Sequence, residues 1–142
     1  SHTYDEQTAE RLVEAIVPSR ADFYVVNYAS CDMVGRTGVL GAAIRAVEAV
    51  DAGVGAVVDA MARPEGAVLV TAGHGNAEQM VDPADHGAVT AHTLNPVPLV
   101  CVADGVAAVR GGGILADVAP SVCDLLGVAP PASWTGRTLL VR

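Results

Sequence analysis

Two apolar runs, each too short and too β-branched to be a helix, lie on either side of the longest helical pattern in the chain. Residues 22–28 and 67–71 place Val beside aromatic or aliphatic residues and predict buried strands. Between them, apolar residues recur at spacings of three and four, which predicts a helix with one apolar stripe over residues 38–63. The stripe consists of Leu40, Ile44, Val47, Val50, Val54, Val57 and Met61. The order strand, helix, strand predicts an α/β fold with a parallel sheet between helices.

The rest of the chain extends this pattern. A first helix carries Leu12 and Ile16 and ends near Pro18, with a capping box expected over residues 3–6. Residues 96–102 predict a third strand, and a last helix begins near Leu115 and ends at Gly127. No linker or repeat interrupts the sequence, so we expect a single domain over residues 1–142.

Charge and cysteine content exclude several classes of protein. The formal net charge is −8 and there is no lysine, so neither nucleic acid nor an anionic membrane surface is an expected partner. The three cysteines form no Cys-x-x-Cys pair, which is typical of a reducing compartment, and no apolar run is long enough to span a bilayer. We therefore expect a cytoplasmic protein.

Unusual polar residues gather in the segments that connect the predicted strands. In a parallel sheet these segments lie near the carboxyl ends of the strands, where ligands bind. Carboxylates and imidazoles gathered there suit a divalent metal with mixed nitrogen and oxygen ligands, such as Mn²⁺ or Zn²⁺. The alternative is that they are solvated loop residues. The candidates are Asn27, Cys31, Asp32, Arg36, His74, Asn76, Glu78, Asp82, Asp85, His86, His92 and Thr93.

Three of these segments carry a family resemblance. Residues 27–38 read NYASCDMVGRTG and resemble the motif N-F/Y-A-N-x-D-M-V-G-H-T-G of cofactor-independent phosphoglycerate mutases. Residues 71–78 read TAGHGNAE, similar to T-A-D-H-G-N-A-E, and residues 90–98 read TAHTLNPVP, similar to T-A-H-T-x-N-P-V-P. The resemblance covers nearly the whole chain in order. It implies the C-terminal part of the mutases' metal-binding domain, which has the alkaline-phosphatase-like fold.

The resemblance also implies which residues hold metal. In the family this domain binds two manganese ions, and a serine from an N-terminal segment carries the phosphoryl group. Asp32 and His92 match two ligands of one ion, and His74 matches a ligand of the other. Arg36 stands where the family has a metal-binding histidine, and Gly73 stands where it has a metal-binding aspartate. The serine segment and the domain that grips phosphoglycerate have no counterpart in these residues.

The two departures lead to a hypothesis about Arg36. A guanidinium about 4 Å from a divalent cation is repelled by roughly 8 kcal/mol at an effective dielectric constant near 20. We therefore expect Arg36 to replace the cation and to pair with Asp32, the alternative being an arginine that points into solvent. Asn76 and Glu78 are expected to hold the loop together. Cys31 is a further candidate, as a nucleophile whose pKa a nearby arginine lowers, against the alternative of an inert cysteine.

Three functions follow from this interpretation. The first is a phosphoglycerate-mutase-like module with a degraded metal site, which is inactive as an isolated chain and binds no cofactor. Such a module would bind a small phosphorylated or carboxylated ligand, or a partner, in the crevice. The second is metal-dependent phosphoryl transfer or phosphate-ester hydrolysis, completed by another chain, with Mn²⁺ or Zn²⁺ retained. The third is a repurposed enzyme that uses Cys31. Missing strands would leave an open sheet edge or apolar face, so a homo-oligomer or a complementary chain is expected.

Overall fold

The computed structural model describes residues 4–19 and 21–142, which form two compact units. The first unit contains residues up to 61 together with residues 74–97, and the second contains residues 62–73 and 98–142. The expectation of a single domain stays a prediction. The capping box expected over residues 3–6 includes Thr3, which lies outside the described residues.

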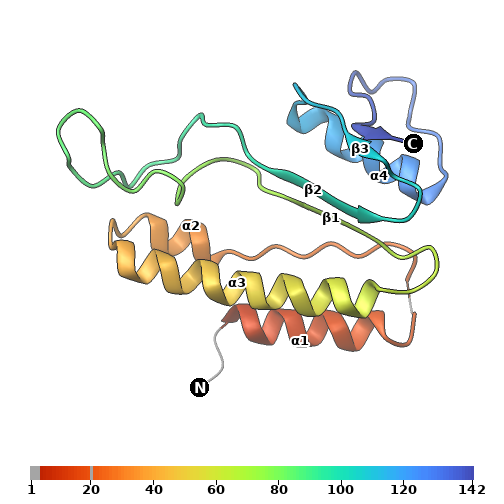
Figure 1. Ribbon diagram of the computed structural model, residues 1–142, viewed down its shortest axis with the longest axis horizontal. Helices are drawn as coiled ribbons and strands as arrows, with labels where there is room; N and C mark the ends of the chain where they lie inside the picture. The colour runs from red at the N-terminus through yellow and green to blue at the C-terminus, as the bar shows by residue number, and fades with distance from the viewer. Residues whose placement is uncertain (1–3, 20) are drawn as a thin grey trace. The chain divides into compact units, whose positions relative to one another are not determined.

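Two long helices build the first unit (Figure 1). Helix α1 spans Tyr4–Ile16 and helix α3 spans Leu40–Met61, and the two lie side by side. Both helices were predicted. Between them the chain passes through an extended segment and the short helix α2, Ser30–Gly35, which also packs on α3.

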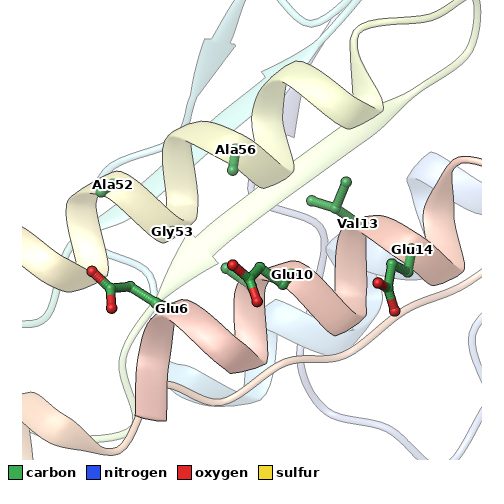
Figure 2. A pocket seen from close by; sticks show the side chains of 8 residues that line it. Glu6, Glu10, Val13, Glu14, Ala52, Gly53 and Ala56 are labelled. Atoms are coloured by element: carbon green, nitrogen blue, oxygen red, sulfur yellow. The ribbon is translucent and has the colours of Figure 1, made fainter. Parts of the chain in front are cut away.

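Small side chains set how closely α1 and α3 approach. The buried face of α3 consists of Ala43, Ala46, Gly53 and Val57. Figure 2 shows Ala52, Gly53 and Ala56 of α3 opposite Val13 and three glutamates of α1, which together line a groove between the helices. The apolar stripe predicted on α3 is therefore divided, because Val57 is buried whereas Leu40, Ile44 and Val47 are exposed.

The second unit contains two small antiparallel sheets. Strand β1, Ala67–Thr71, pairs with β2, Leu99–Ala103, in the register Leu69↔Cys101. Strand β3, Ala108–Val109, pairs with β4, Leu140–Val141. The 3₁₀-helix η1, Leu115–Asp117, leads into α4, Val118–Leu126, which ends at Gly127 as predicted. Gly127 adopts the left-handed conformation.

The predicted parallel sheet is wrong, because both described sheets are antiparallel. Parallel neighbours need a crossover, and the described segment between β1 and β2 contains no helix that could provide one. Residues 22–28 were predicted as a strand. They alternate between exposed and half-buried positions from residue 23 onward, as an extended chain does, but they pair with no described strand. Among the described residues, no helix is long and apolar enough to cross a membrane.

Candidate functional site

The polar loop of residues 74–95 folds back on itself and brings two histidines together. The Thr93 amide donates to the Gly75 carbonyl at 2.9 Å, and these two residues form an isolated antiparallel bridge. His74 directly precedes Gly75, and His92 directly precedes Thr93. Side chains alternate between the two faces of an extended chain, so both histidines project from the face opposite to that of the bridged residues. Their rings stack with centroids 3.7 Å apart and planes at 18°.

Helix α2 supplies the carboxylate and the guanidinium of the site. Asp32 and Arg36 are four residues apart, which is the spacing of neighbours on one helix face. Arg36 Nη2 lies 3.0 Å from Asp32 Oδ2, and Arg36 Nε donates to Asp32 Oδ1 at 3.3 Å. The ion pair expected between these residues is therefore present.

His92 completes the cluster by approaching both partners. Its Nε2 atom lies 2.9 Å from Asp32 Oδ1 and 2.8 Å from Arg36 Nη2. One ring nitrogen carries either a proton or a lone pair in the ring plane, so it donates to Asp32 in one tautomer and accepts from Arg36 in the other. Asp32 and Arg36 thus compete for the same atom of His92.

These contacts hold Asp32 in its ionised form. The hydrogen bond from Arg36 is the main influence that lowers the pKa of Asp32, and the contact with His92 acts in the same direction. Partial burial of the carboxyl group opposes them without reversing the shift.

A second network fixes the loop beneath the cluster. Glu78 accepts hydrogen bonds from the Thr93 hydroxyl, from Asn95 Nδ2 at 2.9 Å and from the Asn76 amide at 2.5 Å. The bond from Thr93 is the largest of the influences that lower the pKa of Glu78 to about 2. The Asn76 side chain in turn donates to Asp32 Oδ1 at 3.3 Å. Asn76 and Glu78 therefore hold the loop together, as expected.

The network includes one residue that the sequence interpretation missed. Asn95 Nδ2 also donates to Gln79 Oε1 at 3.0 Å, so a single amide joins two residues across the loop. Its presence in the TAHTLNPVP motif was the available signal, but nothing in the sequence linked it to Glu78.

The cluster fits a metal ion poorly. Asp32, His74 and His92 each offer a donor atom, and these atoms all lie within 4.8 Å of one another. However, Arg36 Nη2 contacts two of the three residues, and its charge faces the donor pair that a cation would need. At a separation of about 4 Å and an effective dielectric constant near 20, a guanidinium and a divalent ion repel each other by roughly 8 kcal/mol. With Arg36 in this position, a cation could reach these donor atoms only by displacing the guanidinium.

The other candidate residues lie outside this cluster. Asn27 is exposed, His86 lies in an exposed turn with φ of 58°, and nothing lies within 4 Å of the place where a side chain on Gly73 would begin. Cys31 is half-buried, and burial together with the negative charge of Asp5 raises the pKa of its thiol. The expectation that an arginine lowers the pKa of Cys31 is wrong, because burial and Asp5 outweigh any such effect.

Comparison with known proteins identifies the family. The sequence profile of the metalloenzyme superfamily matches residues 1–130. The chain belongs to the metalloenzyme superfamily. This agrees with the resemblance carried by the three motifs. Arg36 and Gly73 therefore occur in a member of a superfamily of metalloenzymes.

Within the metalloenzyme superfamily, the similar proteins are phosphoglycerate mutases. The chain is 52% identical over 135 residues to the 2,3-bisphosphoglycerate-independent phosphoglycerate mutase of Pseudomonas putida strain GB-1. This match covers 95% of this chain and 26% of that protein. The chain is 49% identical over 141 residues to the enzyme of the same name from Chloroflexus aggregans, covering 96% of this chain and 26% of the relative. The chain thus spans about a quarter of the length of the curated relatives it matches.

A solved structure gives the same result. The phosphoglycerate mutase of Leishmania mexicana, crystallised at low cobalt concentration, superposes with a TM-score of 0.86 at 30% sequence identity. The match covers 96% of this chain and 28% of that protein. The fold is therefore that of one part of a metalloenzyme-superfamily protein.

Proposed function

We propose that this chain is a phosphoglycerate-mutase-like module in which the guanidinium of Arg36 has taken the place of a divalent cation. The module binds a small phosphorylated or carboxylated ligand beside Arg36 and has no mutase activity by itself. The three cysteines are all unpaired, which supports a location in the reducing cytoplasm.

The single observation that carries this proposal is the position of Arg36 Nη2. It lies 3.0 Å from Asp32 Oδ2 and 2.8 Å from His92 Nε2, so one nitrogen contacts both residues that match ligands of the same ion. A cation bound there would have to displace the arginine and break a charge-assisted pair.

The exposure of Arg36 supports the proposed class of ligand. Its side chain is 55% exposed, and its Nη1 atom makes no hydrogen bond to any described residue. A planar guanidinium with a free edge suits the oxygens of phosphate or carboxylate. Because Asp32 already neutralises part of the charge, we expect dissociation constants for a single phosphate near the millimolar range.

A manganese titration followed by electron paramagnetic resonance tests the loss of metal binding. We expect no binding to the wild-type chain at 1 mM Mn²⁺ and at least tenfold tighter binding to Arg36→His than to Arg36→Gln. Both variants remove the guanidinium, but only histidine adds a third ligand beside Asp32 and His92, so Arg36→Gln is the matched control. Stoichiometric binding of Mn²⁺ to the wild-type chain would overturn the proposal.

A second titration tests the ligand. Adding inorganic phosphate or 3-phosphoglycerate should shift the amide resonances of residues around Arg36 in the wild-type chain and not in Arg36→Gln. The exposed Arg11 on α1 provides the control, since Arg11→Gln removes the same charge from a helix outside the loop. Equal shifts in both variants would show that the anion binds without Arg36.

Metal-dependent phosphoryl transfer, completed by another chain, is the second candidate. It is favoured by the cluster of donor atoms from Asp32, His74 and His92, which stays together in spite of Arg36. A manganese-dependent phosphatase activity of the wild-type chain would support it over the first. The third candidate requires that Cys31→Ser abolish an activity that Cys101→Ser leaves intact, and the raised pKa of Cys31 counts against it.

A further inference from the structure

The groove between α1 and α3 has a base of small residues (Figure 2). Ala9 of α1 and Gly53 of α3 are buried there, whereas Ala52 and Ala56 are exposed along the α3 side. The two helices already touch at the base, since a Cβ on Gly53 would lie 3.3 Å from the Ala9 Cβ. The groove has a volume of about 500 Å³, which is in the range of binding pockets.

A row of carboxylates edges this groove on the α1 side. Glu6, Glu10 and Glu14 all line it, and they follow one another at intervals of four residues. On a helix this interval sets side chains on one face, about 6 Å apart along the axis. The residues that line the groove include no arginine, lysine or histidine. The groove therefore has a negatively charged edge.

A buried carboxylate adds negative charge at the base. Asp5 lies one helical turn before Ala9 on the buried face of α1 and is 1% exposed, and neither of its oxygens has a hydrogen-bond partner among the described residues. Burial and, after it, the charge of Asp5 raise the pKa of Tyr28, whose hydroxyl lies 3.2 Å from the place of a Cβ on Gly53. A buried carboxylate without a donor is costly, so a positive charge brought to the groove is favourable.

We infer that the groove between α1 and α3 binds a basic amphipathic helix of another protein, with arginine or lysine at every fourth residue and small apolar residues between. The side chains of such a helix repeat at the same interval as the carboxylates on α1, so each cation meets a carboxylate when the helix axes run alongside. Ala52, Gly53 and Ala56 leave space for its backbone to approach closely. This surface shares no residue with the Asp32 cluster and does not depend on the proposed function.

A second copy of this chain is a poor occupant of the groove. The chain has no lysine and a net charge of −8, so two copies repel each other. Helix α1 of a second copy would also set glutamates beside glutamates, and like charges placed together at an interface oppose binding. The charge of the groove thus selects a partner of the opposite sign.

An NMR titration of the full chain with a capped peptide tests the inference. The probe consists of four repeats of Ala-Ala-Ala-Arg, and the matched control peptide has glutamine in place of arginine. We expect the arginine peptide to shift the amide resonances of the groove residues and to saturate below 1 mM, with at least tenfold weaker binding of the glutamine peptide. No binding at 1 mM, or equal binding of both peptides, would overturn the inference.

Spermidine, a flexible cation without a helical backbone, separates recognition of a helix from attraction of charge alone. We expect it to bind at least tenfold more weakly than the arginine peptide, because it cannot pack against the alanines of the groove. Equal affinities would show that the groove binds polycations in general and would overturn the assignment of a helix.

Two variants of exposed residues test the place of binding. Ala56→Leu fills the groove and should weaken binding of the arginine peptide at least fivefold, whereas Ala84→Leu, at an exposed loop alanine outside the groove, should leave it unchanged. Glu14→Gln should weaken it by roughly two- to fivefold. Asp51→Asn removes the same charge from an exposed position of α3 that does not line the groove and is the control. Equal effects within either pair would place the peptide elsewhere.

Asp5→Asn separates binding from folding. This variant removes a buried charge without changing the shape of the side chain, so it should raise the melting temperature and yet weaken binding of the arginine peptide by about threefold. A variant that becomes more stable and binds as tightly as the wild-type chain would show that Asp5 does not contribute to the attraction of the groove for a basic helix.

Discussion

Arg36 and Asp32 form a two-contact ion pair on one face of helix α2, with Nη2 3.0 Å from Oδ2 and Nε 3.3 Å from Oδ1. The pair is partly exposed, so its contribution to global stability is small. Its importance is local, because the same guanidinium also contacts His92 and so links helix α2 to the loop. The arginine thereby holds a carboxylate and an imidazole together.

The first prediction concerns the ionisation of Asp32. Replacing Arg36 by glutamine removes the influence that contributes most to lowering the pKa of Asp32, so that pKa should rise toward its ordinary value of 3.8. Carbon-detected NMR titration of the side-chain carboxyl groups measures it directly. Asp117, whose pKa is lowered by backbone hydrogen bonds in the second unit, should not change and serves as the internal reference. An Asp32 pKa that does not move would mean that the pair does not form in solution.

The second prediction concerns acid stability and Glu78. The folded-state pKa of Glu78 is about 2, below its ordinary value of 4.5. Its ionised form therefore stabilises the fold above pH 4.5, and this contribution is lost as the pH falls from 4.5 toward 2. Glu78→Gln should lower the free energy of unfolding by about 1 kcal/mol at pH 7, since the site is solvent-exposed, and should flatten the acid limb of the stability curve.

Urea unfolding at pH 7, 4 and 2.5 checks this prediction. Glu14→Gln is the control, because Glu14 is an exposed carboxylate on α1 with no hydrogen bond to a described residue. The difference between the two variants should be largest at pH 7 and should shrink at pH 2.5. Parallel curves for both variants would show that the Glu78 network does not stabilise the loop.

The helices were predictable from the sequence, whereas the partners of the strands were not. A spacing of three and four residues identifies α3 almost to its ends, because that pattern depends only on the helix itself. The run 67–71 likewise identifies β1 to the residue. A strand's pattern, however, does not say which strand it pairs with or in which direction, and the expected parallel neighbour of β1 is an extended segment without a ladder.

Packing decided which face of α3 turned inward. Hydrophobicity alone favours Leu40, Ile44 and Val47 as core residues, since they are the largest aliphatics. Close approach of α1 and α2 instead selects Ala43, Ala46 and Gly53, whose small size lets the helix backbones come together. A sequence pattern ranks residues by hydrophobicity and cannot show how near the neighbouring helix lies.

The membership of the site was predictable from its motifs, but its contacts were not. Asp32, His74 and His92 lie in three separate motifs, and the structure brings them within 4.8 Å. Their meeting depends on the Gly75–Thr93 bridge and on the Glu78 network, which are tertiary contacts within a loop that has no regular periodicity. Cys31 illustrates the opposite case, because its position next to Asp32 suggested activation whereas its buried environment raises its pKa.

The third prediction concerns Ser121, which anchors the C-terminal segment of the second unit. Ser121 is fully buried, donates to the Asp117 carbonyl at 2.8 Å and accepts from the Leu139 amide at 2.8 Å. Ser121→Ala leaves the Leu139 amide without its acceptor and should lower the free energy of unfolding by about 1–3 kcal/mol. Ser133→Ala, at an exposed serine of the same segment, should change it by less than about 0.5 kcal/mol. Thermal unfolding of both variants by circular dichroism distinguishes the two effects, and equal melting temperatures would contradict the assigned role.

The fourth prediction compares two helical glycines that look alike in the sequence. A Cβ on Gly35 would overlap Asn76 Oδ1, so Gly35→Ala must push the Asn76 side chain away from Asp32. A Cβ on Gly55 meets nothing within 4 Å, so Gly55→Ala should stabilise α3 by roughly 0.5–1 kcal/mol through helix propensity alone. Gly35→Ala should instead destabilise the chain and shift the NMR resonances of His92 and Asp32, because the loop that holds His92 is displaced from α2. If both alanine variants were equally stabilised, Asn76 would not pack against Gly35, and the loop would have to reach the Arg36–Asp32 pair by another route.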